Sequence, residues 1–386
     1  MRYICPVCNR SMERDLLVFL SHTEGHIVDE IKKSHPSWVG SDGICRKCHD
    51  FYRKQIQPEP ARKGAEGSPG ERVTRDLQPA NRQAWIERTR LLGAATRAHF
   101  LPASLIPFFI GALFARSQGY GLSGLLLAAG LLGVAALHLA GNVFNDYFDH
   151  VTGADQHSGK KSPFFGGSRV IQGSHISPAT MVLLGLFLLT VSLACGSFII
   201  ARTGDPLLLA VMLIAGILAV EYTAPPLRLA YRKLGELVIF LLFGTLLVMG
   251  SFYLFSLRFT IGSFLISLPV SFLIFNVIIC NEIPDFGTDR KAGKDTLISL
   301  TGKKKGYLIY ACGLIFSMAA LVANIVAGLL PPASAFLLAF YGFGLKALGI
   351  LKDRIDDEAA LIRASALTLV LHSAVGLSTI VLLLIS

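Results

Sequence analysis

Asn142-Val-Phe-Asn145-Asp146-Tyr-Phe-Asp149 and Asn281-Glu-Ile-Pro-Asp285-Phe-Gly-Thr-Asp289-Arg290 are two acidic stretches, each placed where a long apolar run meets a polar loop. On a helix, residues three or four positions apart lie on one face, so each stretch directs a pair of carboxylates the same way. Four carboxylates at the end of an apolar bundle would repel one another without a cation between them. Oxygen ligands favour Mg²⁺, and Mg²⁺ held by few carboxylates usually binds a phosphate as well. The predicted magnesium ligands are Asp146, Asp149, Asp285 and Asp289.

The composition indicates a polytopic membrane protein. Hydrophobic residues make up 52% of the chain, charged residues 16%, and the mean hydropathy is +0.55, values that a soluble protein with a single core does not reach. Apolar windows of about 18 to 25 residues predict an all-α bundle of nine transmembrane helices. The predicted spans are 99–116, 121–144, 179–201, 206–223, 235–256, 260–281, 306–327, 332–351 and 364–385.

The positive charges predict the orientation of the chain. The formal net charge is +10, but Lys and Arg gather in the loops after predicted spans 2, 4, 6 and 8, which favours anionic lipid headgroups over nucleic acid as the partner. By the positive-inside rule these loops are cytoplasmic, and both acidic stretches then face the cytoplasm. No secretory signal opens the chain, so we expect a cytoplasmic N-terminus and a multi-pass protein of the cell's inner or plasma membrane.

Four of the seven cysteines lie in the first 48 residues, as two CxxC pairs. In a reducing compartment such pairs predict a structural zinc site, here formed by Cys5, Cys8, Cys45 and Cys48. The segment between the pairs predicts an inserted amphipathic helix from Met12 to Lys33. Its His22 and His26 are either a second metal pair or two exposed helix histidines. Residues 1–54 are therefore predicted to be a zinc-ribbon-like domain, and docking of a protein partner is one role open to it.

A change in composition separates this domain from the apolar part of the chain. Residues 55–83 are rich in Pro, Gly, Glu, Arg and Gln and predict a flexible linker. From Ala84 to Ala98 the pattern is that of an amphipathic helix at the membrane surface. Residues 84–386 then form the predicted membrane domain.

Further polar residues fall on the predicted cytoplasmic face or just inside it. Their cations suit an anion such as a diphosphate, while ordinary flanking charge is the alternative for any one of them. Within predicted span 2, His138 is either a functional residue or a partner in an interhelical hydrogen bond. The candidate substrate-binding residues are Asn142, Asn145, Asp155, Lys161, Arg169, Tyr222, Arg228, Asn281, Arg290 and Lys294.

At these residues the sequence resembles the UbiA superfamily of intramembrane aromatic prenyltransferases. The resemblance rests on Asn145-Asp-x-x-Asp149, the Gly166-Gly167-Ser168 loop, Tyr222-Thr-Ala-Pro-Pro-Leu-Arg228 and Asn281-Glu-x-x-Asp285-x-x-x-Asp289-Arg-x-x-Gly293-Lys294. It covers about 85 to 386, with the family's nine spans, and not the cysteine-bearing N-terminus. The form of the first motif most resembles the 1,4-dihydroxy-2-naphthoate prenyltransferases of menaquinone synthesis.

The resemblance implies an enzyme that transfers a polyprenyl group from an allylic diphosphate to an aromatic acceptor. Magnesium held by the four aspartates would help the diphosphate to leave, and the acceptor ring would attack the resulting carbocation. Aromatic faces, for which Tyr147, Phe148 and Tyr222 are candidates, would stabilise that cation. Relatives with the same acidic motifs use 4-hydroxybenzoate, tetrapyrroles or lipid alcohols as acceptors, and these remain alternatives.

Two other classes of protein fit the sequence less well. A transporter or membrane sensor could also combine a zinc domain with acidic helix ends, but its charges would be expected near the middle of the spans. The sequence contains neither a P-loop motif nor a strand-associated GxGxxG, which excludes the common soluble nucleotide-binding folds.

Overall fold

The structure is a computed structural model that describes residues 2–4, 11–13, 17–18, 25–36, 38, 44–45, 48–49, 52, 89–153, 162, 164–165, 167–173 and 175–385. The chain divides into two compact units, Met1–Asn81 and Arg82–Ser386. The boundary between them falls inside the stretch 55–83 that the sequence predicts to be a linker.

The first unit contains short strands and one helix. Strands β1 (Arg2–Ile4) and β2 (Ser11–Glu13) pair antiparallel, as do β3 (Leu17–Val18) and β4 (Ile44–Cys45). Helix α1 (Gly25–Ser34) packs Ile31 against a small core formed with Trp38, Ile44 and Tyr52. The predicted helix from Met12 to Lys33 is therefore wrong at 12–13 and 17–18, because these residues belong to strands β2 and β3.

Of the four predicted zinc ligands, Cys5 and Cys8 lie outside the described residues. Cys45 is described only through the backbone of β4, and Cys48 packs against the small core. His22 is also outside the described residues, and nothing is described of the side chain of His26. Within the described part of the chain, no group of three or more His, Cys, Asp or Glu residues could hold a metal ion. The zinc site stays a prediction.

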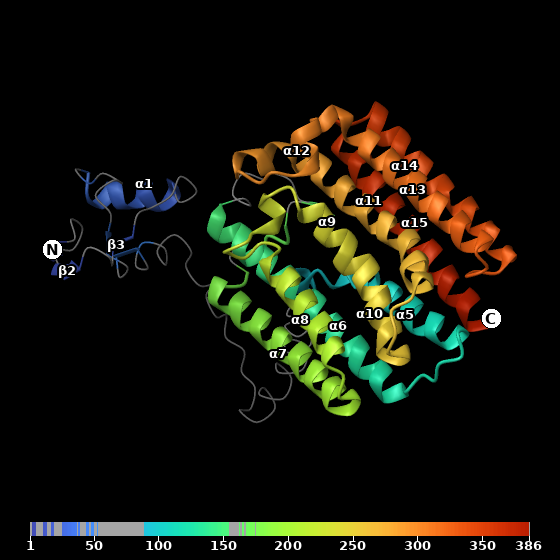
Figure 1. Cartoon of the computed structure of the whole chain (residues 1–386). Helices are drawn as coiled ribbons and strands as arrows, with labels where there is room; N and C mark the ends of the chain where they lie inside the picture. The colour runs from blue at the N-terminus through green and yellow to red at the C-terminus, as the bar shows by residue number, and fades with distance from the viewer. Residues whose placement is uncertain are drawn as a thin grey trace, which may run out of the picture. The chain divides into compact units, whose positions relative to one another are not determined.

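The second unit is helical (Figure 1). Residues 89–96 form the described part of the predicted surface helix, which ends at Arg97. The elements that follow are η4 (Ala98–Phe100), α5 (Pro102–Ser117), α6 (Gly124–Thr152), α7 (Pro178–Thr203), α8 (Pro206–Glu221), η6 (Leu229–Tyr231), α9 (Gly235–Phe240), the π-helical turn η7 (Leu241–Thr245), α10 (Leu246–Ser256), α11 (Ile261–Lys291), α12 (Leu297–Thr301), η8 (Lys303–Lys305), α13 (Gly306–Val326), η9 (Pro332–Phe340), α14 (Tyr341–Asp353) and α15 (Glu358–Ile385).

Local sequence signals place the ends of these helices. Proline occupies the first helical position of α5, α7 and α8, where its missing N–H costs nothing. The side chain of Asp205 caps α8 by accepting from Leu208 N at 2.7 Å, and Thr260 forms a capping box with Ser263 at the start of α11. Helix α6 ends at Gly153, whose φ of 79° suits glycine.

Eight helices of the described chain are long and apolar enough to cross a membrane, which confirms the prediction of an all-α polytopic membrane protein. The expected nine spans are not all matched. Helix α8, at the predicted span 206–223, has only 16 residues. At 1.5 Å per residue it extends about 24 Å, less than the roughly 30 Å of a bilayer core.

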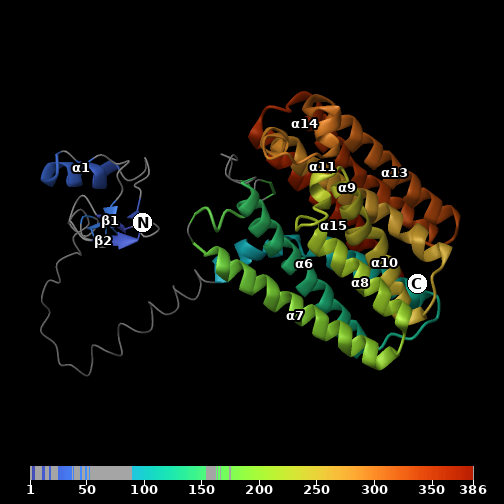
Figure 2. The same ribbon diagram turned by 60° about the vertical axis from the view of Figure 1, so that its left-hand side comes forward.

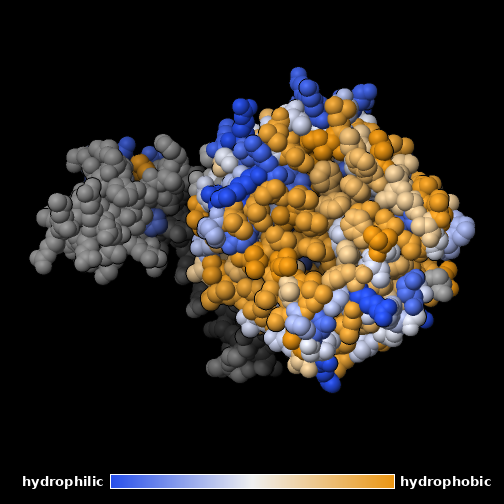
Figure 3. Space-filling view, viewed as in Figure 1, coloured by the Kyte–Doolittle hydropathy of each residue, from blue (hydrophilic) through white to orange (hydrophobic). Residues whose placement is uncertain are grey.

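Helix α11 forms the centre of the unit. It packs against α13, α15, α10 and α5, while α6 and α7 run side by side at the periphery (Figure 2). Small residues allow close helix contacts: a Cβ built on Gly111 of α5 would lie 2.1 Å from the carbonyl oxygen of Val248 in α10. The face of this unit seen in Figure 3 is broadly hydrophobic, with hydrophilic residues gathered near its borders. Side chains such as Phe187, 63% exposed, are suited to contact lipid.

Candidate functional site

The acidic stretches meet at one cavity of about 710 Å³ that is bounded by α5 to α11. One part of it is apolar and includes Phe108, Leu193, Met212 and Leu246. The other part collects polar and charged side chains, so the cavity has distinct hydrocarbon and ionic regions. The polar lining residues include Arg97, Asn142, Asn145, Asp149, Asn281, Glu282, Asp285, Thr288, Asp289 and Lys294.

The two aspartates of α6 have different surroundings. Asp149 lines the cavity and accepts hydrogen bonds from Tyr231 Oη at 2.8 Å and from Asn145 Nδ2 at 3.3 Å. Asp146 is only 2% exposed and is not among the lining residues. It accepts from Arg97 Nη2 in an ion pair and from the backbone N–H of Ser168 at 3.1 Å. Arg97, the partner of Asp146 in this ion pair, itself lines the cavity.

The two aspartates of α11 both line the cavity, one helical turn apart. The ammonium of Lys294 lies 3.8 Å from Asp289 Oδ1, and the backbone N–H of Lys294 donates to the Asp289 carbonyl at 2.8 Å. Asp149 and Asp289 each fall in the last turn of a long helix. The partial negative charge of a helix C-terminus adds to theirs, which strengthens the attraction for a cation.

Three buried oxygen atoms near these carboxylates have no hydrogen-bond partner among the described residues. They are Asn145 Oδ1, Asn281 Oδ1 and Glu282 Oε2, and all three residues line the cavity. Because buried polar atoms normally have partners, these oxygens are candidates to bind a ligand. Carboxylate and amide oxygens are the donors that Mg²⁺ prefers. The donor set therefore fits a hard divalent cation.

The described side chains do not form a closed metal site by themselves, because no three His, Cys, Asp or Glu residues of the described chain come close enough together. This arrangement suits Mg²⁺, which is commonly held by one or two carboxylates and completed by water and substrate phosphates. A closed cage of protein ligands would instead indicate a structural metal.

The predicted cations differ in their positions. Lys294 lines the cavity. Burial alone would lower the pKa of Lys294, but the carboxylates of Asp289 and Asp149 outweigh burial and raise that pKa well above its ordinary value. Arg228 does not line the cavity: its guanidinium carbon lies 4.0 Å from the centre of the Tyr231 ring. Arg290 is exposed, and neither it nor the partly buried Arg169 is a lining residue. Asp155 and Lys161 lie outside the described residues.

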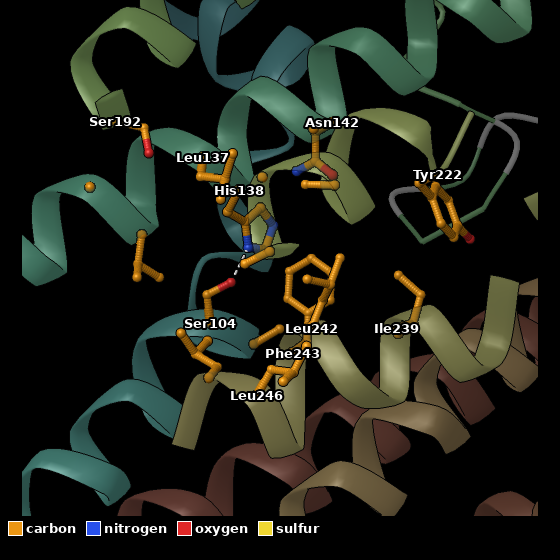
Figure 4. Close-up of a pocket in the computed structure, with 18 of the residues that line it drawn as sticks. Ser104, Leu137, His138, Asn142, Ser192, Tyr222, Ile239, Leu242, Phe243 and Leu246 are labelled. Atoms are coloured by element: carbon orange, nitrogen blue, oxygen red, sulfur yellow. Dashed lines mark hydrogen bonds between the residues drawn. The ribbon is translucent and has the colours of Figure 1, made fainter. Parts of the chain in front are cut away.

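The predicted polar residues of α6 continue into the apolar part of the cavity (Figure 4). Asn142 Nδ2 donates to the carbonyl oxygen of Thr96 at 3.0 Å. His138, one turn further, is hydrogen-bonded through Nδ1 to Ser104 Oγ of α5, and its ring lies edge-on to Phe243 with centroids 5.0 Å apart. The alternative of an interhelical hydrogen bond for His138 is therefore confirmed.

One tyrosine lines the cavity, and a second, which is not a lining residue, contacts Asp149. Tyr222 lines the cavity, and burial raises the pKa of its phenol. Burial and the neighbouring Asp149 carboxylate raise the pKa of Tyr231, which keeps its hydroxyl a hydrogen-bond donor. Tyr147 and Phe148, the other aromatic candidates, pack edge-to-face on each other and are not lining residues.

Sequence reasoning missed Arg97, Tyr231 and Glu236 as parts of the site. Glu236, 1% exposed, accepts a hydrogen bond from the backbone N–H of Leu297 and so holds the segment after α11 against α9. Arg97 and Tyr231 reach the acidic residues from segments 49 and 82 positions away. The only local signal was their place in polar loops beside apolar runs.

The sequence matches the UbiA prenyltransferase family over residues 104–382. Among characterised proteins it is 29% identical over 243 residues to the 1,4-dihydroxy-2-naphthoate octaprenyltransferase of Bacillus subtilis (strain 168), covering 63% of this chain and 76% of that protein. It is 30% identical over 238 residues to UbiA prenyltransferase domain-containing protein 1 of Ailuropoda melanoleuca, covering 61% of this chain and 68% of that protein.

Solved structures share the fold. The apo structure of a UbiA homolog from Aeropyrum pernix K1 superimposes with a TM-score of 0.59 at 18% identity, covering 73% of this chain and 98% of that one. A digeranylgeranylglyceryl phosphate synthase structure gives a TM-score of 0.54 at 16% identity, and the match covers 78% of this chain and 100% of that one. The structure of a UbiA homolog from Archaeoglobus fulgidus bound to GPP and Mg²⁺ superimposes with a TM-score of 0.50 at 18% identity. The match covers 75% of this chain and 99% of that one. The chain belongs to the UbiA prenyltransferase family.

Proposed function

We propose that this prenyltransferase joins a polyprenyl group from an allylic polyprenyl diphosphate to 1,4-dihydroxy-2-naphthoate, a step of menaquinone synthesis. The observation that carries the proposal is the single cavity in which carboxylates and Lys294 meet a hydrocarbon-lined region. A polyprenyl diphosphate has the same division, with an anionic head and a long apolar tail. Its head fits the polar region and its tail fits the apolar one.

Asp149, Asp285 and Asp289 would hold magnesium together with the diphosphate, and the buried amide oxygens of Asn145 and Asn281 lie beside them. When bound, Mg²⁺ withdraws charge from the diphosphate oxygens and so favours cleavage of the allylic C–O bond. Lys294, kept cationic by its carboxylate neighbours, would neutralise charge on the departing diphosphate. Arg97 would supply a second cation, and Asp146 would hold Arg97 in place or join the metal ligands.

Cleavage of the C–O bond leaves diphosphate and an allylic carbocation. The electron-rich acceptor ring forms the new C–C bond to that carbon. With dihydroxynaphthoate as acceptor, the attacked ring carbon loses its carboxylate as CO₂, which restores aromaticity. The ring of Tyr222 faces the cavity and can stabilise the cation without forming a bond to it. The apolar walls exclude water, which would otherwise capture the cation.

The choice of acceptor is supported by the similarity to the Bacillus subtilis enzyme and by the form of the first acidic motif. The other acceptors of the family, 4-hydroxybenzoate, tetrapyrroles and lipid alcohols, are the alternative outcome. The charge of the loops supports a cytoplasmic position for the N-terminus and for the site.

We also propose that Cys5, Cys8, Cys45 and Cys48 bind one structural zinc ion. The two CxxC pairs in the sequence support this, because paired CxxC motifs are typical of structural zinc sites. A four-thiolate site leaves no open position for catalysis. The zinc would therefore stabilise the first unit, which has only a small core, or present it to a protein partner.

The direct test uses purified full-length protein in lipid nanodiscs with MgCl₂, radiolabelled polyprenyl diphosphates of several lengths, and a panel of acceptors. We expect a prenylated, decarboxylated naphthoquinol from dihydroxynaphthoate and no product after chelation with EDTA. The Asp285→Asn variant is the matched inactive control. A product formed with another acceptor and not with dihydroxynaphthoate would overturn the acceptor assignment. The assignment of prenyl transfer would still hold.

A further inference from the structure

A second cavity lies outside the reaction site, in a groove of about 640 Å³ between α14 and α15. Its floor is apolar and is formed mainly by Gly349, Ile350, Ala366, Leu367 and Val370. Helix α13 leads away from the end of the bundle that carries the acidic residues, and α14 returns to it. The groove is therefore at the same end of the bundle as the polar part of the reaction cavity.

Three cations border this groove. Lys346, Arg354 and Arg363 are exposed, and the only acidic lining residue is Asp353. In the described part of the chain, none of the three cations forms an ion pair. The nearby Asp356 is bonded instead to Lys303, with 2.7 Å between Nζ and Oδ1. The groove thus combines an apolar floor with a net positive rim.

The position of Lys346 distinguishes this rim from ordinary flanking charge. Lys346 lies seven residues before the end of α14, about 10 Å inside the helix. Its neighbour Leu345 is 59% exposed and Val370, across the groove, is 47% exposed, so this face is suited to contact lipid. A lysine at that depth extends its ammonium toward the headgroup level, where phosphates lie.

We propose that the groove binds one anionic phospholipid, whose phosphate is held by Lys346, Arg354 and Arg363 and whose acyl chain lies on the apolar floor. The site is independent of the proposed prenyl transfer. A soluble anion would gain nothing from the apolar floor, and a zwitterionic lipid would bring its own cation to the positive rim. The combination therefore selects a lipid with net negative charge.

Two glycines of α14 provide a matched pair of substitutions. A Cβ built on either Gly349 or Gly342 meets no atom within 4 Å, so both positions have open space beside them. Gly349 lines the groove and Gly342 does not. The Gly349→Leu variant should fill the groove, and Gly342→Leu should carry the same helix substitution without touching the site.

The experiment measures the melting temperature and, by native mass spectrometry, the number of lipids bound to the full-length protein in detergent. Phosphatidylglycerol, phosphatidylcholine or inorganic phosphate is added in separate series. We expect phosphatidylglycerol alone to raise the melting temperature and to remain bound. Lys346→Gln and Arg363→Gln should each weaken its binding about fivefold, and Gly349→Leu should abolish it.

The controls are Gly342→Leu and Lys352→Gln, the second of which removes an exposed cation of α14 that does not line the groove. Both should keep the response of the unaltered chain. An equal loss in Lys352→Gln would show only diffuse attraction between the lipid and the protein surface. That result, an unchanged response in Gly349→Leu, or equal stabilisation by phosphatidylcholine or inorganic phosphate would overturn the proposal.

Discussion

The guanidinium of Arg97, which lines the cavity, forms an ion pair with the carboxylate of Asp146, which is 2% exposed and does not line it. Arg97 is held there with φ near 48°, at the junction between the surface helix and η4. One of the four predicted metal ligands is thus already neutralised by a side chain of the protein. The other three line the cavity, so Asp146 is the one member of the acidic cluster that is shielded from it.

The first prediction concerns the acidic cluster. Asp146→Asn and Asp285→Asn should each lower turnover at least about a hundredfold, because interactions that stabilise developing charge are typically worth several kcal/mol. The measurement is initial rate at saturating substrates, with membrane insertion checked by detergent extraction. Asp356→Asn is the control, since its side chain is 81% exposed and does not line the cavity. Near-normal turnover of the Asp285→Asn variant would show that Asp285 takes no part in the reaction.

Tyr231 should affect the binding of Mg²⁺ through its hydrogen bond to Asp149. Tyr231→Phe removes only the hydroxyl that donates to Asp149 Oδ1 at 2.8 Å. A hydrogen bond to a charged group is worth about 1.5–3 kcal/mol, so we expect at least roughly a tenfold change in the Mg²⁺ concentration needed for half-maximal rate. The control is Tyr120→Phe, whose ring packs on Phe252 away from the site. A Mg²⁺ dependence identical to that of the unaltered enzyme would contradict this role.

Lys294 should contribute to binding of the prenyl diphosphate, the donor substrate. Lys294→Met should raise KM for the prenyl diphosphate, and not KM for the acceptor, because its ammonium lies among the carboxylates that would receive the diphosphate. Lys291→Met is the matched control, since Lys291 is exposed and does not line the cavity. Arg228→Ala should change donor KM less than Lys294→Met, because Arg228 contacts the ring of Tyr231. A change confined to acceptor KM would reverse the assignment of the two substrates.

The raised pKa of Lys294 leads to a prediction about alkaline pH. A lysine whose pKa is higher in the folded than in the unfolded state contributes stability that is complete below the unfolded pKa of 10.5 and is lost only as pH rises through the folded pKa. The difference in melting temperature between the unaltered chain and Lys294→Met should therefore stay constant from about pH 7 to pH 10. A difference in melting temperature that decreased between about pH 7 and pH 10 would show that the carboxylates do not stabilise the protonated form of Lys294.

The parts of the site that were predictable are those set by local sequence. The spacings Asp146 to Asp149 and Asp285 to Asp289, together with the apolar runs before them, define two helix ends without any knowledge of the fold. Arg97 and Tyr231 could not be assigned in this way. Each contacts its aspartate only because segments distant in the sequence pack side by side. The hydrophobic periodicity of the sequence does not predict such a contact.

One error has the same origin, and the other concerns the end of a helix. The helix predicted from Met12 is replaced at 17–18 by strand β3, which pairs with β4 almost thirty residues later. Helix α8 has the apolar composition of a full span, but it ends at Glu221 before the chain turns through the proline pair Pro225-Pro226. Composition alone does not show where an apolar helix ends.

The last prediction separates the two units of the chain. The boundary at Asn81 and Arg82 and the composition of 55–83 indicate that the membrane unit folds without the first unit. Deleting residues 1 to 80 should therefore leave prenyl transfer largely intact. The residues that line the reaction cavity all belong to Arg82–Ser386, so the deletion removes none of them.

Within the first unit, Cys5→Ser should lower bound zinc and unfold that unit alone, because a small domain with a four-thiolate site depends on its metal for folding. Zinc content, protease resistance of the first unit and specific activity are measured on both variants in the same membranes. Cys312→Ser, at an exposed thiol of α13, is the control for loss of a cysteine. Loss of activity in the truncated protein at equal expression and insertion would show that the first unit acts on the active-site loops, and the division of the chain proposed here would then be wrong.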